Sequence, residues 1–135
     1  MKTYAVIYNN NEIREKSSSG GIFSALADKF DVVYGVAMTG AEMMRVEGNI
    51  APLRGSKYFQ AKVGDSFKQV KKDLIDGNKV LFSGTRCQIN GLSLYLGKDY
   101  QNLFLLDIIC HGTPSSNYGE NMRNIKKASM ASWKA

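Results

Sequence analysis

Two cysteines and a single histidine are the side chains of this sequence best suited to nucleophilic or metal chemistry. Cys87 is expected in the first turn of a helix, where the helix dipole stabilises a thiolate and favours reactivity or metal ligation. Cys110 and His111 close an apolar run that is typical of a strand. Because adjacent strand residues point to opposite faces, these two could hardly ligate one ion. A Cys–His nucleophile pair would therefore join Cys87 to His111, the candidate catalytic residue.

Structural roles compete with each of these chemical ones. Cys87 could be a small residue that packs its helix on a sheet, and a lone histidine such as His111 is often a hydrogen-bonded structural residue. A zinc site needs four ligands, whereas the chain offers three candidates at poor spacing, so we do not expect zinc.

Loops that combine Gly with Ser or Thr form a second chemical group, because free backbone N–H groups at a helix start attract anions. Four loops stand out, SSSGG (17–21), GSKY (55–58), SGTRCQINGL (83–92) and CHGTPSS (110–116), and three of them combine these residues at a strand end or a helix start. Gly20 and Gly21 suggest that something approaches the backbone closely, although a tight turn into a helix would also need them. Gly84 and Thr85 lie at the carboxyl end of a strand, where open α/β sheets bind ligands. Their spacing matches neither a P-loop nor GxGxxG.

The elements that position these loops follow from hydrophobic periodicity and turn residues. Strands are expected at residues 3–8, 31–38, 42–47, 79–82 and 103–109. Helices are expected from a serine cap at Ser18 or Ser19 to residue 30, and at 63–75, 87–96 and 116–127. The last strand is almost continuously apolar, as expected of one covered on both faces. The alternation predicts an α/β fold in three layers, a mixed, mostly parallel sheet flanked by helices, with residues 1–135 as a single domain.

Composition and charge narrow the class of protein. The 135 residues suit one domain, and 44% hydrophobic with 22% charged residues excludes disorder and coiled coil. No apolar run is long enough to span a membrane, no secretory signal is present, and two cysteines suit a reducing cytoplasm. The net charge of +6, concentrated between Arg54 and Lys79 and near the C-terminus, favours anionic partners such as phosphorylated cofactors. No nucleic-acid-binding motif accompanies it, so nucleic acid is not expected.

Four motifs, taken together and in order, resemble one protein family. They lie within residues 3–118 and are SSSGGIFSAL, LRGSKYFQAKVGDSF, VLFSGTRCQINGLSLYL and LFLLDIICHGTPS. This series is similar to the coenzyme F-420 hydrogenase/dehydrogenase beta-subunit family. The resemblance implies a flavin (FAD)-dependent, iron–sulfur-associated oxidoreductase or electron-transfer subunit. Its partners would be the flavin nucleotide and either a redox protein or a deazaflavin coenzyme.

The resemblance also implies which residues form the site. Those expected to line the flavin and substrate cleft are Ser18, Ser19, Gly20, Gly21, Ser56, Lys57, Tyr58, Gly84 and Thr85. Lys57, in a Gly-Ser loop beside an aromatic residue, is the best single candidate for a contact with phosphate or flavin. Cys87 and Cys110 are the candidate ligands of an iron–sulfur cluster. Arg86 stands where family members usually carry proline.

By this resemblance the chain corresponds to the N-terminal portion of the family, and residues 128–135 have no family character. Full-length members supply further cysteines downstream, and two thiols cannot hold a four-iron cluster, so no intact cluster is expected in this chain. The alternative is a catalytically inactive fragment that retains an anion- or nucleotide-binding cleft. A truncated α/β domain would also expose apolar surface, which predicts a homo-oligomer.

Overall fold

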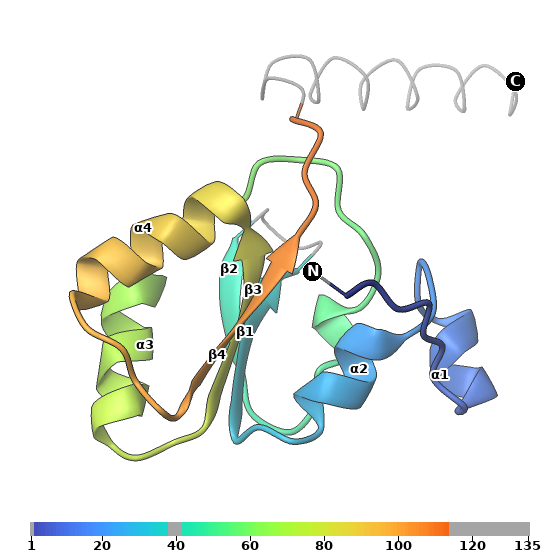
Figure 1. Cartoon of the computed structure of the whole chain (residues 1–135), viewed down its shortest axis with the longest axis horizontal. Helices are drawn as coiled ribbons and strands as arrows, with labels where there is room; N and C mark the ends of the chain where they lie inside the picture. Colours follow the sequence, from blue (N-terminus) through green and yellow to red (C-terminus); the bar gives the residue numbers. More distant parts are fainter. Residues whose placement is uncertain (1, 38–41, 114–135) are drawn as a thin grey trace, which may run out of the picture.

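The computed structural model describes residues 2–37 and 42–113 (Figure 1). In chain order its elements are α1 (Asn11–Glu15), α2 (Ile22–Ala27), β1 (Val32–Val36), β2 (Met43–Val46), the short 3-10 helix η1 (Ala51–Leu53), α3 (Ser66–Ile75), β3 (Val80–Thr85), α4 (Arg86–Leu96) and β4 (Leu103–Ile108). The helix predicted at residues 116–127 and the tail at 128–135 lie outside the described residues.

The four strands form one mixed sheet in the order β2-β1-β3-β4. β1 pairs antiparallel with β2 and parallel with β3, and β3 pairs parallel with β4. The register places Val32 opposite Val80 and Val80 opposite Leu103. This arrangement confirms the predicted α/β fold with a mixed, mostly parallel sheet flanked by helices.

Alternating side chains along the strands build a core on each face of the sheet. Helices α3 and α4 cover one face and α2 lies on the other, which gives the three layers seen in Figure 1. The core under α3 and α4 consists of Val32, Tyr34, Val70, Leu74, Val80, Phe82, Ile89, Leu92 and Leu96. The core under α2 and η1 consists of Ala27, Val33, Ala37, Ile50, Leu53 and Leu81. β1 and β3 are buried on both faces, which explains their nearly uniform apolar sequences.

A polar cluster is buried where α3 meets the β1–β2 hairpin. Asp73 of α3 is 5% exposed, and its carboxylate accepts hydrogen bonds from Tyr34 Oη at 2.6 Å and from two nitrogens of Arg45 at 2.7 and 2.8 Å. The Arg45 guanidinium holds the pKa of Asp73 below its ordinary value, and burial raises the pKa of Tyr34. The cluster therefore ties three elements together through a charge-assisted network.

The helices predicted at residues 63–75 and 87–96 are confirmed, with small shifts at their starts. α4 begins at Arg86, one residue before the expected start, and ends at Gly97 as expected. α3 begins at Ser66 rather than at residue 63, because Val63 belongs to the preceding turn, where its carbonyl accepts from Ser66 N–H. Within residues 2–37 and 42–113, no helix is long and apolar enough to cross a membrane.

The predictions for the N-terminal segment are partly wrong. Residues 3–8 are mostly exposed and form no strand, because no strand of the described part of the chain lies beside them to complete their hydrogen bonds. Tyr8 N–H donates instead to Gly20 O at 2.7 Å. Helix α1 was not predicted, and its N-cap is Asn10, whose side chain accepts from Ile13 N–H. Helix α2 starts at Ile22 behind Gly21, not at a serine cap.

β4 departs from prediction in its environment. The apolar sequence predicts a strand that is covered on both faces. Among the described residues its only strand neighbour is β3. Phe104 is 46% exposed, Ile108 51% and Ile109 87%. β4 is thus an edge strand of the described sheet, and burial by residues 2–37 and 42–113 does not explain its apolar sequence.

Candidate functional site

The carboxyl edge of the sheet brings several of the predicted loops together. β3 ends at Thr85 and β4 at Ile108, and these two residues are partners in the parallel register. The first turn of α4, which carries Cys87, and the loop that carries Cys110 therefore leave the sheet side by side. The loop after η1 reaches the same edge, because Lys62 forms a bridge with Glu42 at the start of β2. Figure 1 shows this loop, in green, passing over the edge at which the β4 arrow ends.

The SSSGG and GSKY loops are joined directly, although they are far apart in sequence. The Ser56 N–H donates to Ser18 Oγ at 2.7 Å, and the two residues are 38 positions apart. Ser18, Ser19, Ser56 and Tyr58 are all exposed around this contact. The Ser18 hydroxyl accepts in this bond, so its own proton stays free to donate to a ligand. We call this contact between residues 17–21 and 55–58 the loop junction.

Lys57 has a structural task at the loop junction. Its ammonium group donates to the carbonyl oxygens of Leu53 and Arg54, both at 2.7 Å, and so caps the end of η1. Partial burial lowers the pKa of Lys57. Two of its three N–H donors are thus used within the chain, which leaves one for an anion.

The chain itself fills the space that Gly20 and Gly21 leave. A side chain on Gly20 would place its Cβ 2.6 Å from the carbonyl oxygen of Val6, so the close approach inferred from sequence is made by the N-terminal segment. Gly21 has a left-handed φ of 78°, which L side chains rarely adopt, and it is the N-cap of α2. The close approach of the N-terminal segment therefore accounts for Gly20, and the tight turn into α2 accounts for Gly21.

Gly84 and Thr85 form the last positions of β3 and the cap of α4. Thr85 is the N-cap, and with Gln88 it forms a reciprocal capping box in which the Gln88 side chain accepts from Thr85 N–H at 3.0 Å. The space beside Gly84 is occupied by the same Gln88 side chain and by Phe82. This strand end is therefore rigid, and two of its donors are already satisfied.

The cysteines and the histidine are exposed at the carboxyl edge. Cys87 lies in the first turn of α4, as predicted, and its Sγ is 3.1 Å from Thr85 Oγ1, not bonded to His111. Cys110 and His111 follow the end of β4, so the strand alternation assumed for them does not apply. Both cysteines are free thiols. No group of three or more His, Cys, Asp or Glu side chains among the described residues is arranged to hold a metal ion.

An ion pair that the sequence did not suggest joins the two cysteine loops. Arg86 Nε lies 2.6 Å from Asp107 Oδ2, which links the start of α4 to the end of β4. No hydrogen bond among the described residues connects these strand ends to the loop junction, whose contacts are with α2 and η1, so the predicted site residues fall into two separate groups.

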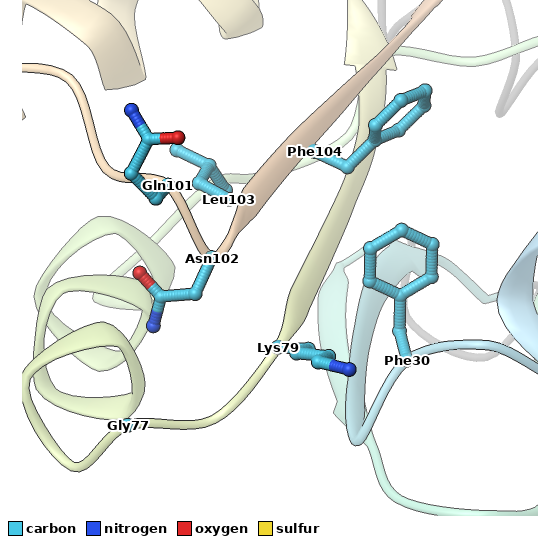
Figure 2. Close-up of a pocket in the computed structure, with 7 residues that line it drawn as sticks. All are labelled: Phe30, Gly77, Lys79, Gln101, Asn102, Leu103 and Phe104. Carbon is cyan, nitrogen blue, oxygen red and sulfur yellow. The ribbon is translucent and has the colours of Figure 1, made fainter.

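The hollows of the described surface lie away from these residues. A hollow of about 500 Å³ at the amino end of β4 is lined by Phe30, Lys79, Gln101 and Phe104, among others (Figure 2). A second hollow of about 610 Å³ lies between β4 and the end of α4. Both border the edge strand, and neither contains a predicted cofactor-binding residue.

The loop junction and the cysteines near the ends of β3 and β4 fit different cofactors. The loop junction offers serine hydroxyls and one ammonium group, the donors that a nucleotide phosphate requires, so these residues fit a flavin nucleotide. An iron–sulfur cluster needs four thiolates, and the sequence contains two cysteines, so this chain alone does not fit one.

Comparison with protein-family models, with curated proteins and with solved structures gave no match. A function is therefore inferred from the geometry of the loop junction and of the strand ends, and from the resemblance of the motifs that form them.

Proposed function

We propose that this chain is the flavin-binding portion of an oxidoreductase of the coenzyme F-420 hydrogenase/dehydrogenase beta-subunit type, with FAD as its cofactor. The observation that supports this most is the loop junction. Two loops chosen independently for their anion-binding composition are held together by the Ser18–Ser56 hydrogen bond. The bond brings exposed serine hydroxyls of one loop beside Lys57 and Tyr58 of the other, so that both loops can contact one anionic ligand.

The residues of the junction would divide the work of binding. Ser18 and Ser19 would donate hydroxyl protons to the phosphates, and the remaining N–H of Lys57 would add a charge-assisted hydrogen bond. The exposed phenol ring of Tyr58 would stack on a flat ring of the nucleotide. The bound flavin would supply hydride or electron transfer, while the protein holds it against its partner.

Cys87, Cys110 and His111 follow the carboxyl ends of β3 and β4. In this proposal the cysteines become cluster ligands only where further thiolates are supplied, and the electron partner is a redox protein or a deazaflavin coenzyme. The Arg86–Asp107 ion pair would fix the spacing of the two cysteine loops.

A second candidate is a catalytically inactive fragment that keeps the anion-binding cleft. The two-thiol count and the exposure of both cysteines favour it. In that case the junction would bind the phosphates of a nucleotide without orienting a flavin ring.

Titration of the purified chain with FAD, followed by flavin fluorescence and equilibrium dialysis, tests the proposal. We expect saturable binding, and Ser18→Ala should raise the Kd roughly 2- to 10-fold, the effect of losing one hydrogen bond. Ser93→Ala, an exposed serine on α4, is the matched control and should leave the Kd unchanged.

Three outcomes separate the candidates. Saturable binding with a midpoint potential shifted from that of free FAD supports the flavin site, because a protein that positions the flavin ring tunes its potential. Equal affinities for FAD and ADP, with no shift in potential, support the inactive fragment. Absence of binding of either nucleotide contradicts both.

A further inference from the structure

The edge strand β4 has a sequence that is nearly symmetric about its own centre. Residues 103–109 read LFLLDII, and six of these seven residues are apolar. If two copies of the strand run antiparallel about Leu106, Leu103 lies opposite Ile109 and Phe104 lies opposite Ile108. Only Leu105 then meets a charged residue, Asp107. An antiparallel pair of this kind matches apolar side chains on both faces of the sheet.

β4 pairs with β3 through one edge only, and several of its apolar side chains are uncovered within the described part of the chain. Phe104, Ile108 and Ile109 are 46%, 51% and 87% exposed, and β3 is the only strand neighbour of β4 there. Natural edge strands are usually protected by lysine, proline or a bulge. β4 contains neither lysine nor proline. Its single charged residue, Asp107, already forms an ion pair with Arg86 at 2.6 Å.

The two hollows of the surface fit the same geometry. One borders Phe104 and Phe30 on the α2 face, and the other borders Leu103 and Leu105 on the α3–α4 face. In the antiparallel arrangement, Ile108 of a second copy comes opposite Phe104 and Ile109 of that copy comes opposite Leu103. The two exposed isoleucines therefore fall beside the two hollows. Figure 2 shows Phe30 and Phe104 next to each other in the lining of the first of these hollows, with their ring centroids 5.7 Å apart.

We propose that this chain forms a two-fold dimer by antiparallel pairing of β4 with β4 of a second copy, centred on Leu106. The two sheets then continue as one eight-stranded sheet, and Ile108 and Ile109 of each copy pack into the hollows of the other. The occupant is a second copy, because the β4 sequence is complementary to itself under a two-fold axis. Asp107 carries its Arg86 partner into the interface, so no charge is left unpaired. The inference does not depend on flavin binding.

Sedimentation equilibrium on the full 135-residue chain tests the dimer. We expect twice the mass of one chain at micromolar concentration. Ile108→Lys should weaken the association about tenfold or more, because it buries a charge against an apolar residue of the second copy. Ile75→Lys makes the same change at an apolar residue that is 68% exposed on α3 and should leave the dimer intact. Circular dichroism checks that both variants fold.

Cysteine cross-linking tests the register. In a Cys87→Ser, Cys110→Ser background, Leu106→Cys places two thiols opposite each other, at Cβ separations of about 4.5–5.5 Å, and should form a disulfide-linked dimer on mild oxidation. Ile108→Cys is the control, since its two copies are then four positions apart along the strands, about 13 Å, and should not cross-link. A monomeric parent chain, equal weakening by Ile75→Lys, or equal cross-linking of the two cysteine variants would each overturn the proposal.

Discussion

β3 and β4 are neighbouring strands of equal length and similar composition, yet they occupy different environments. β3 (Val80–Thr85) is buried at its first five positions, whereas three of the six β4 residues are exposed. β3 has strands on both sides and helices on both faces, while β4 has one described strand neighbour and lies at the end of the sheet. An apolar run thus indicates that a segment is a strand, but the topology decides whether it is covered. The surplus apolar surface of β4 is then free for a partner.

The largest expected effect is a difference in the free energy of unfolding between matched Phe→Ala substitutions in β3 and β4. Phe82→Ala in β3 removes a fully buried ring and should lower the free energy of unfolding by about 3–5 kcal/mol. Phe104→Ala in β4 removes a ring that is 46% exposed and should cost about 1 kcal/mol or less at monomer concentrations. Urea denaturation of both variants provides the measurement. Equal losses would mean that β4 is as well covered as β3.

A smaller effect is expected at the buried carboxylate of α3. Asp73→Asn removes the charge that two nitrogens of Arg45 and the hydroxyl of Tyr34 hold. We expect a loss of about 2–3 kcal/mol in the free energy of unfolding, because the partly buried guanidinium of Arg45 loses its buried partner and keeps only the exposed carboxylate of Glu47. Denaturant midpoints of the variant and the parent give this value. A loss in the free energy of unfolding smaller than that of an exposed ion pair would show that the cluster does not stabilise the fold.

The same carboxylate predicts how stability depends on pH. Folding lowers the pKa of Asp73 from its ordinary value of 3.8, chiefly through the Arg45 hydrogen bonds. Its contribution is therefore complete above pH 3.8 and is lost as the pH falls through the lower pKa of the folded state. Unfolding free energies measured between neutral pH and acid should fall more steeply for the parent than for Asp73→Asn. Parallel curves would show that another group controls acid unfolding.

The smallest effect belongs to the carboxylate of the edge strand. Asp107→Asn breaks the ion pair with Arg86, whose side chain is 75% exposed, so we expect a change of about 0–1 kcal/mol in monomer stability. Comparison of this variant with Asp73→Asn, by the same denaturation assay, measures how far the edge differs from the interior. A loss as large as that of Asp73→Asn would show that the edge is shielded from solvent.

Periodicity and turn residues were enough to predict α3 and α4 and the four strands of the sheet, but not the elements that precede α2. These signals are local, since Gly97 and the apolar positions of each element lie within a few residues of one another. The segment 3–8 failed because strand formation needs a neighbour, which its own sequence cannot specify.

Contacts between distant residues could not be predicted from sequence at all. The loop junction joins Ser18 to Ser56, and the buried cluster joins Tyr34 to Asp73, at separations of 38 and 39 positions. Asp73 gave no signal, because on a helix rich in lysine an aspartate is typical of a solvated face. The composition of the SSSGG and GSKY loops indicated anion binding, but their proximity became visible only in the folded chain.

The strand register described above also has a consequence for the order of events during folding. The residues that β1 and β3 pair are roughly twice as far apart in sequence as those that β3 and β4 pair, and each doubling of a loop adds about 0.6 kcal/mol to the entropy of closure. We therefore expect the β3–α4–β4 unit to form early and β1 to dock afterwards, which pulsed hydrogen exchange on the refolding chain can follow. The apolar edge of β4 would then be exposed in the earliest ordered species, so nascent chains at high concentration could associate before the rest of the sheet is complete.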